Sequence, residues 1–143
     1  LLDGDTLRTG LNGDLGFSPT HRSDNIRRTA EVASFLARQG QIAIVALVSP
    51  SAYDRALARD IGGPLFFEVH VKASVDTCAA RDPKGLYAKA RAGQIQGFTG
   101  VSAPYDEPAH PEIVIETDKH AVTACIKALL DELEVKEVLL PER

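Results

Sequence analysis

The chain has 143 residues, of which 44% are hydrophobic and 25% are charged, and its net charge at pH 7 is −4. This length and composition predict one compact globular domain and exclude an intrinsically disordered chain. The small net charge, without a long run of either sign, argues against binding of nucleic acid by bulk electrostatics.

Apolar runs and cysteines limit the cellular context. The longest apolar run, Ile42 to Val48, is far too short to span a bilayer, and the first residues carry no signal-peptide pattern. Cys78 and Cys125 lie in alanine-rich segments without metal-type spacing. We therefore expect buried thiols rather than a disulfide or a zinc site, and a cytoplasmic protein with no membrane partner.

The first third of the chain predicts a strand end, a loop and a long helix. Leu1 and Leu2 are typical of the end of a buried strand, and residues 3–17 of a loop with short helical pieces. Ser18-Pro19 is a helix-start signal, and Gly40 fits the left-handed position after a helix. Between them, a helix over about residues 22–39 has apolar positions on one face, namely Ile26, Ala30, Ala33 and Ala37.

The middle of the chain predicts two strands separated by a helix. Residues 41–48 form a continuous apolar run, which is typical of a parallel strand buried on both faces. A helix follows over residues 51–60 and is broken by Gly62-Gly63-Pro64. Residues 65–71 form the next strand, with apolar and polar positions alternating.

Shorter elements follow. Ser74 is expected to cap a helix ending near Asp82-Pro83, before a short basic helix over residues 84–92 and an irregular stretch over residues 93–111. Residues 113–116 form a short strand. Asp118 is expected to cap a last helix whose apolar face holds Val122, Cys125 or Ile126, Leu129 and Leu133. This alternation predicts an α/β fold with a parallel sheet, over residues 1–133, and a charged tail or linker over residues 134–143.

Polar groups directly follow three of these strands. They are Asp3-Gly4-Asp5, Ser49-Pro50 and Thr117-Asp118. Ligands of parallel α/β sheets bind beyond the carboxyl ends of the strands, so these groups are candidates for one site. An Asp-Gly-Asp sequence is also common in ordinary turns, and that alternative stays open.

Two groups of cations could bind anions. Arg8, Arg22, Arg27 and Arg28 lie near Asn25, either as a clamp for phosphate or sulfate or as a solvated helix face. The segment Arg81 to Arg91 contains several cations around a Pro-Lys-Gly joint, and it is either a mobile basic lid or an exposed basic helix. Phe98 lies between Gly97 and Gly100, where an aromatic ring suits stacking on a base better than a core.

Taken together, the ordered blocks of this sequence resemble the signature blocks of adenylylsulfate (APS) kinases over about residues 1–133. The blocks are Leu2-Asp3-Gly4-Asp5 with Arg8, Gly10-Leu11-Asn12, Asp14 to Ser18, Asn25 to Arg28, Ser49-Pro50, Arg81 to Tyr87, Lys89 to Gly93 and Gly97 to Gly100. The resemblance implies a three-layer P-loop NTPase-like fold. It also implies transfer of the γ-phosphoryl group of ATP, with Mg²⁺, to the 3′-hydroxyl of adenosine 5′-phosphosulfate, which yields 3′-phosphoadenylylsulfate and ADP.

The resemblance also implies roles for individual residues. Phe17 and Phe98 would enclose the adenine, while Arg8, Arg22 and Asn25 would hold the phosphosulfate and ribose. The catalytic group would comprise Asp3, Asp5, Ser49 and Lys84, with Asp3 reaching the metal through water. Ser49 is better explained as a substrate contact than as a transient phosphate acceptor, because in-line transfer needs no such intermediate. Gly4, Val48 and Gly97 would complete the substrate site, and Arg81, Lys84 and Thr117 would contact ATP.

The sequence departs from the family at one motif. It contains no G-x-x-x-x-G-K-[ST], the loop that cradles phosphates and whose strand would be central in the sheet. Because the chain begins with Leu1-Leu2 rather than methionine, we expect residues upstream, and the join at Gly62-Gly63-Pro64 looks short. These residues alone are expected neither to fold well nor to bind ATP properly.

Three explanations stay open: the protein has a further N-terminal segment, it is a degenerate domain that only binds nucleotide, or it is an isolated fragment. The competing function is a non-catalytic APS-binding regulatory domain of an ATP sulfurylase fusion, and a nucleoside monophosphate kinase fits less well. The resemblance further implies a homodimer, and the tail could link to a sulfurylase.

Overall fold

The computed structural model describes residues 1–136, and these divide into two compact units. Unit 1 comprises Leu1–Phe66 and Ala103–Glu107, and unit 2 comprises Phe67–Ser102 and Pro108 onward. Each unit holds a two-stranded parallel sheet and helices, so the α/β class with parallel strands is confirmed.

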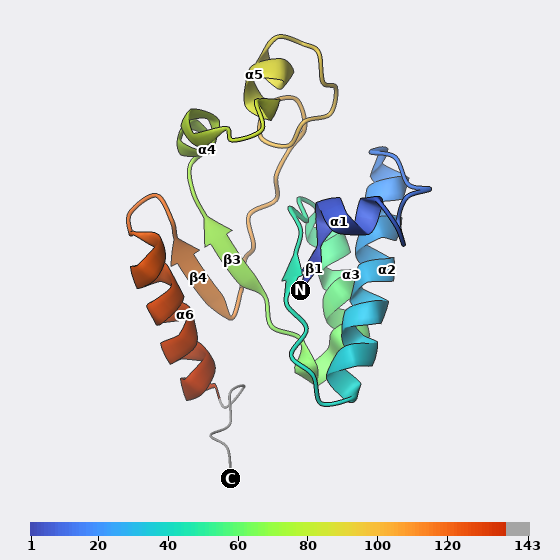
Figure 1. The fold of residues 1–143 in the computed structure, drawn as a ribbon, viewed down its shortest axis with the longest axis vertical. Helices are drawn as coiled ribbons and strands as arrows, with labels where there is room; N and C mark the ends of the chain where they lie inside the picture. The colour runs from blue at the N-terminus through green and yellow to red at the C-terminus, as the bar shows by residue number, and fades with distance from the viewer. Residues whose placement is uncertain (137–143) are drawn as a thin grey trace. The chain divides into compact units, whose positions relative to one another are not determined.

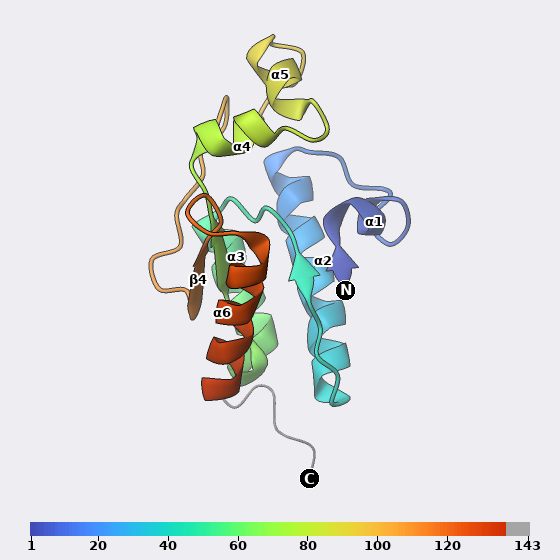
Figure 2. The same cartoon turned by 60° about the vertical axis from the view of Figure 1, so that its left-hand side comes forward.

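Unit 1 is built from two strands and three helices. Strand β1 (Leu2–Asp3) pairs in parallel with β2 (Val45–Ala46), and helix α1 (Gly4–Arg8) follows β1 directly. Helices α2 (Pro19–Arg38) and α3 (Ala52–Gly62) run side by side in both views of the ribbon (Figures 1 and 2). The short 3₁₀ helix η1 (Gly63–Leu65) follows α3.

Local signals explain the limits of α2. The Ser18 hydroxyl accepts a hydrogen bond from the His21 N–H at 3.3 Å, and Pro19 occupies the first helical position, where its missing N–H costs nothing. Gly40 follows the helix with a φ of +79°, as expected for a left-handed terminating glycine. The helix begins at Pro19, three residues before the expected start, because Ser18 and Pro19 start it ahead of its first apolar position.

Helices α2 and α3 join through polar contacts as well as apolar ones. The Ser23 hydroxyl donates to Asp54 Oδ1 at 2.6 Å, and the Ser34 hydroxyl donates to the Ile61 carbonyl at 3.1 Å. Asp54 and Ser34 are both buried. Buried polar groups that are paired in this way fix one alignment of two helices more strictly than apolar packing does.

The expectation of a strand over residues 41–48 buried on both faces is wrong. Only Val45–Ala46 are strand, and Ile42, Ile44 and Val48 are each more than 60% exposed. Among the described residues β2 pairs with β1 alone, and a strand is buried on both faces only where further strands and helices cover it.

Unit 2 has its apolar core between its sheet and its last helix. Strand β3 (Val69–Lys72) pairs in parallel with β4 (Ile113–Glu116), and α6 (Val122–Val135) packs on β4 (Figure 1). The core comprises Ile113, Ile115 and Cys125, with Val69, Leu129 and Leu133 packed against it. Helices α4 (Val75–Arg81) and α5 (Leu86–Arg91) follow β3. Cys78 in α4 is only half-buried, so the expectation of a buried thiol holds for Cys125 alone.

The last helix begins differently from the prediction. Its N-cap is Ala121, which makes no side-chain cap hydrogen bond, whereas the Asp118 carboxylate accepts from the Ser74 N–H at 3.2 Å. Asp118 therefore ties β4 to the start of α4 instead of capping α6. Val122 and Ile126 are exposed at 74% and 51%, so the buried face of α6 is narrower than expected.

The expected boundary after residue 133 stays a prediction. Helix α6 continues through Val135, and the small apolar group of the tail, Val138 to Leu140, lies outside the described residues. Across the described part of the chain, no helix combines the length and the apolar character needed to cross a membrane.

Candidate functional site

Asp3 and Ser49 follow neighbouring strands of unit 1. Because β1 and β2 are parallel and Asp3 pairs with Ala46, the segments after both strands leave the same edge of the sheet. Gly4 lies close to this edge, since a Cβ there would stand 2.7 Å from Leu47 Cδ2. The structure thus brings Asp3, Gly4 and Asp5 to the same sheet edge as Val48 and Ser49, whereas the third expected group, Thr117-Asp118, follows a strand of the other sheet.

The Asp3 carboxylate caps helix α1. Its Oδ1 accepts hydrogen bonds from the backbone N–H groups of Asp5 at 3.1 Å and Thr6 at 3.0 Å, and from the Thr6 hydroxyl at 3.2 Å. Asp5 lies in the first turn and is exposed. The cap orients the Asp3 carboxylate, while Asp5 stays exposed to solvent.

Ser49 has an unusual backbone conformation. Its φ is +42°, which lies in the left-handed region that residues other than glycine seldom adopt. Arg55 of α3 holds this conformation by donating from Nη1 to the Ser49 carbonyl at 2.7 Å and from Nη2 to the Asp106 carbonyl at 2.6 Å. A strained residue at the end of a strand is typical of a functional position.

Arg8 and Phe17 of unit 1 form a cation–π contact. The Arg8 guanidinium lies over the Phe17 ring at 4.4 Å from its centroid, and Nη1 donates to the carbonyls of Leu15 and Gly16, each at 3.0 Å. The Arg22 Nε donates to the Phe17 carbonyl at 2.9 Å. Phe17 itself is 69% exposed, so an aromatic face and two guanidinium groups stand together at the surface.

Asn25 lies beneath this group on the buried side of α2. Its Oδ1 accepts from Asn12 Nδ2 at 3.1 Å, and the two residues are 5% and 0% exposed. The contact fixes the Asn25 carboxamide with its oxygen toward Asn12, which leaves the NH₂ group as the donor for another partner.

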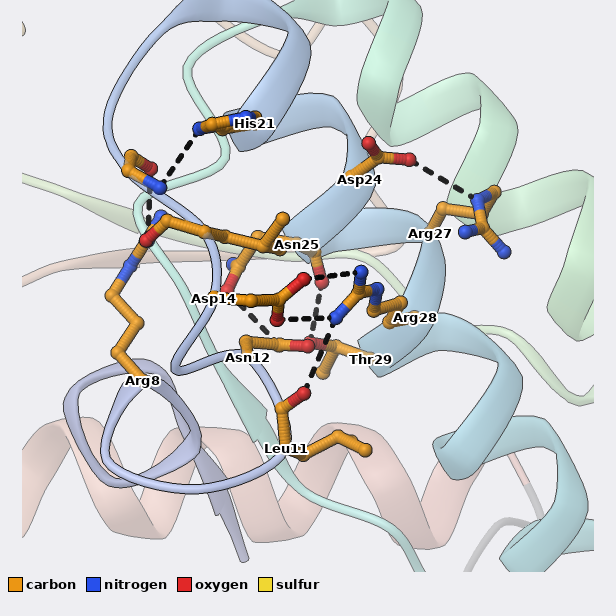
Figure 3. Close-up of polar contacts among 12 residues, drawn as sticks. Arg8, Leu11, Asn12, Asp14, His21, Asp24, Asn25, Arg27, Arg28 and Thr29 are labelled. Atoms are coloured by element: carbon orange, nitrogen blue, oxygen red, sulfur yellow. Dashed lines mark hydrogen bonds and ion pairs between the residues drawn. The ribbon is translucent and has the colours of Figure 1, made fainter.

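The two remaining arginines of the expected clamp form ion pairs instead. Arg27 Nε lies 3.5 Å from Asp24, and Arg28 pairs with Asp14 through two hydrogen bonds (Figure 3). The Arg28 guanidinium holds the pKa of the Asp14 carboxyl below its usual value, and Asp14 raises the pKa of Arg28. The sequence reasoning assigned Arg28 to the anion clamp and gave Asn12 and Asp14 no role.

Arg81 and Thr117 lie together in unit 2, at the ends of α4 and β4. Arg81 Nη1 donates to the Thr117 hydroxyl at 3.2 Å, and Nη2 donates to the Thr117 carbonyl. Both residues line a cavity of about 540 Å³ beside the start of α6, together with His120, Val122 and Cys125. A cavity with mainly apolar lining and one arginine suits an adenine nucleotide, which combines an apolar ring with anionic phosphates.

The basic segment around Lys84 is an ordered turn and helix. The Asp82 carboxylate accepts from the backbone N–H groups of Tyr87 and Ala88, each at 3.1 Å, and Gly85 has a φ of +65°. Burial raises the pKa of Asp82, but the N–H groups of Ala88, Tyr87 and Leu86 together outweigh burial and lower it. Lys84 therefore lies in a turn that is closed by hydrogen bonds between Asp82, which precedes it, and the backbone of Tyr87 and Ala88, which follow it.

Phe98 packs edge-on against Tyr87 of α5, with ring centroids 5.0 Å apart and an angle of 77° between the rings. Its backbone N–H donates to the Ser102 hydroxyl at 2.9 Å, and Gly97 precedes it with a φ of +63°. Burial raises the pKa of the Tyr87 phenol, with Cys78 adding to the effect. This aromatic pair connects the Phe98 loop to the basic segment. The sequence had indicated a role for Phe98 but none for Tyr87.

The expected site residues thus fall into two sets, one in each unit. The set in unit 1 comprises Asp3, Gly4, Asp5, Arg8, Phe17, Arg22, Asn25, Val48 and Ser49, and the set in unit 2 comprises Arg81, Lys84, Gly97, Phe98 and Thr117. Among the described residues, no three His, Cys, Asp or Glu side chains are grouped to hold a metal ion directly. Asp3 and Asp5 suit Mg²⁺, which is commonly held by one or two carboxylates, water and substrate phosphates.

Parallel strands followed at their carboxyl ends by carboxylates, guanidinium groups and an aromatic ring are typical of α/β proteins that bind phosphorylated ligands. The model of the adenylylsulphate kinase family matches residues 1–116. The chain belongs to this family.

Named relatives and solved structures agree. The chain is 47% identical over 139 residues to an adenylyl-sulfate kinase of Oceanobacillus iheyensis, covering 96% of this chain and 70% of that protein. It is 49% identical to that of Paraburkholderia xenovorans, covering 93% of this chain and 74% of that protein. The structure of the Mycobacterium tuberculosis APS kinase CysC in complex with AMPPNP and APS matches with a TM-score of 0.88 at 46% identity, over 93% of this chain and 78% of that one.

Proposed function

We propose that the protein is an adenylylsulfate kinase, which transfers the γ-phosphoryl group of MgATP to the 3′-hydroxyl of adenosine 5′-phosphosulfate. The observation that carries this proposal is the group formed by Arg8, Phe17 and Arg22, which offers a ring face and planar cations at one surface point. An adenine nucleotide with a phosphosulfate matches both features, because bases stack on aromatic rings and guanidinium groups bind oxyanions in pairs.

Each residue of unit 1 has a specific task in this proposal. Phe17 stacks on the adenine, Arg8 and Arg22 neutralise the phosphosulfate, and the Asn25 NH₂ group donates to the substrate. The Asp5 carboxylate accepts a hydrogen bond from the 3′-hydroxyl and orients its oxygen for in-line attack. Ser49 contacts the substrate from the end of β2.

The residues of unit 2 bind the phosphoryl donor. Arg81 and Thr117 bind ATP in the cavity that they line. Lys84 neutralises negative charge on the phosphoryl group that is transferred. Phe98 offers a further aromatic ring on which a base can stack. Mg²⁺, with Asp3 in its water shell, supplies further charge neutralisation when bound.

Coupled ADP release tests this proposal in the intact protein. We expect turnover that depends on adenylylsulfate, and a loss of at least tenfold in kcat/KM for Asp5→Asn and for Arg22→Ala. Unchanged turnover in both variants would rule out the proposed site. Calorimetric binding of the nucleotide without any ADP release would support the regulatory alternative instead.

The proposal also covers the oligomeric state, the localisation and the association of the protein with a second enzyme. We expect a homodimer, cytoplasmic localisation, and either fusion to or association with an ATP sulfurylase. Light scattering on the purified protein measures its mass in solution and tests the first of these. A solved relative, from Thiobacillus denitrificans, is titled a hexameric APS kinase, so a larger mass is the alternative outcome.

A further inference from the structure

The segment between α1 and α2, residues 9–18, carries the aromatic ring and the carbonyl groups on which Arg8 depends. We call it the α1–α2 loop. It contains Gly10, Gly13 and Gly16, and its backbone makes turns rather than a regular helix or strand. Such a segment has little local preference for one conformation, so contacts with the rest of unit 1 must select it.

The Asp14–Arg28 ion pair is one of these contacts, and it joins two side chains through two hydrogen bonds. Arg28 Nη1 lies 2.7 Å from Asp14 Oδ1, and Nη2 lies 2.8 Å from Oδ2, which is the parallel two-bond geometry of a guanidinium on a carboxylate (Figure 3). Nη1 also donates to the Leu11 carbonyl at 3.3 Å. One side chain of the long helix α2 therefore holds the loop at two points.

A second contact holds the loop from below. Asn12 is fully buried, and its Nδ2 donates to Asn25 Oδ1, while the Thr29 hydroxyl donates to the Asn25 carbonyl at 2.7 Å. The loop thereby decides which end of the Asn25 carboxamide is turned toward other partners. Residue 12 lies between the two points at which Arg28 holds the loop, so the ion pair and the buried amides support the same conformation.

At the end of the loop nearest α2, this conformation places Leu15, Gly16 and Phe17 against Arg8. The carbonyls of Leu15 and Gly16 converge on one nitrogen of Arg8, and the Gly16 N–H donates to His21 Nδ1 at 2.9 Å. Phe17 comes directly after them, beneath the Arg8 guanidinium. This convergence depends on the path of the backbone from residue 11 to residue 16, and the Asp14–Arg28 pair lies in the middle of that path.

We propose that Asp14 and Arg28 are positioning residues for the sulfated nucleotide: their ion pair holds the α1–α2 loop so that Arg8, Phe17 and Asn25 meet the substrate together. This inference rests on the proposed function. The pair itself is not in the reacting centre. Asp14 is 60% exposed and Arg28 is 31% exposed at the side chain, and exposed pairs contribute little to the stability of a folded domain. Its main effect is therefore expected on substrate binding.

Steady-state kinetics of Asp14→Asn, Arg28→Gln and the double variant test this inference. We expect each single variant to raise KM for adenylylsulfate about tenfold while KM for ATP stays within about twofold, since displacement of binding groups by about an ångström can cost up to about a hundredfold. The double variant should be no worse than either single one, because both changes remove the same contact. Arg28→Lys should recover the activity only in part, since an ammonium cannot make the two parallel bonds.

The Lys127–Asp131 pair of α6 supplies the matched control. Lys127 Nζ lies 2.7 Å from Asp131, both side chains are exposed, and neither belongs to the proposed site. Lys127→Gln and Asp131→Asn should leave both KM values unchanged. Thermal melting of all variants separates a positioning effect from unfolding, and melting temperatures close to that of the wild type are expected throughout.

The outcomes distinguish this inference from the function on which it rests. If the wild type releases no ADP with adenylylsulfate, the proposed function fails. If the wild type is active but Asp14→Asn and Arg28→Gln keep a normal KM for adenylylsulfate, the positioning role is wrong. Equal increases in both KM values, or effects of the two substitutions that multiply in the double variant, would also overturn it.

Discussion

The guanidinium of Arg8 lies over the ring of Phe17, at 4.4 Å from the ring centroid, while donating to two backbone carbonyls that precede the ring. The cation and the aromatic face are thus fixed relative to each other before a ligand binds. Under the proposed function, a nucleotide stacked on Phe17 would bring its anionic group to Arg8, which would couple recognition of the base to recognition of the charge.

Arg8→Lys tests the planar geometry of this contact. A lysine keeps the charge but loses the fork that reaches both carbonyls and the flat face that covers Phe17. We expect kcat/KM for adenylylsulfate to fall about 10- to 100-fold, because hydrogen bonds of charged groups contribute about 1.5–3 kcal/mol. Arg38→Lys, at the exposed end of α2, is the control and should have wild-type kinetics.

Phe17→Ala tests stacking on the adenine. Stacking of a base on an aromatic ring contributes about 1–3 kcal/mol, so KM for adenylylsulfate should rise about 5- to 150-fold, and Phe17→Tyr should restore it. Phe35→Ala is the matched control, because Phe35 is 65% exposed against 69% for Phe17 but carries no proposed role. An equal effect of the two alanine variants would contradict the assignment of Phe17.

Two substitutions of Asp3 separate its structural role from its chemical one. Asparagine can still accept from the N–H groups of Asp5 and Thr6, whereas alanine cannot. Asp3→Ala should therefore lose about 0.5–2 kcal/mol of unfolding free energy, and Asp3→Asn much less. Both variants should lose turnover, because both lack the carboxylate charge. Full activity of Asp3→Asn would show that the residue only caps α1.

Much of this local structure follows from the sequence because its causes are local. The Ser18 cap, Gly40 after α2 and the strand Ile113–Glu116 depend on residues close by in the chain, and the structure confirms all three. The burial of residues 41–48 depends instead on what covers β2, and the sequence of the strand does not contain that information.

Polar pairs between residues far apart in the sequence explain the other differences between the predictions and the structure. Asp118 precedes a helix and looks like its cap, yet its carboxylate binds the N–H of Ser74 because β3 and β4 bring the two segments together. The Asp14–Arg28 pair could not be predicted either, since no spacing rule connects an aspartate in a glycine-rich loop with an arginine two turns into the following helix. Sequence patterns therefore predicted candidate site residues by type, while the hydrogen-bond partners of those residues became visible only in the fold.

Ser49→Ala distinguishes a substrate contact from a phosphate acceptor. If Ser49 only contacts the substrate, the variant should keep turnover within about tenfold of the wild type, as is usual for the loss of one neutral hydrogen bond. Abolished turnover, with a phosphorylated serine detected by mass spectrometry in the wild type during the reaction, would contradict this assignment.

The lowered pKa of Asp82 predicts a pH-dependent stability of the segment that carries Lys84. A carboxyl whose pKa is lower in the folded state stabilises the fold above its unfolded pKa of about 4, and this contribution is lost as pH falls through the folded value. Urea unfolding should show wild type more stable than Asp82→Ala at pH 7, with the difference shrinking as the pH falls below about 4. A difference that does not change with pH would contradict this prediction.

The most direct measurement of the central claim follows the phosphoryl group itself. The intact protein is incubated with adenylylsulfate and with ATP carrying a labelled γ-phosphoryl group, and the nucleotide products are separated. We expect the label on the 3′-oxygen of the sulfated nucleotide, in a one-to-one ratio with ADP. Label that appears only as inorganic phosphate, or that stays on ATP although adenylylsulfate is bound, would contradict the account.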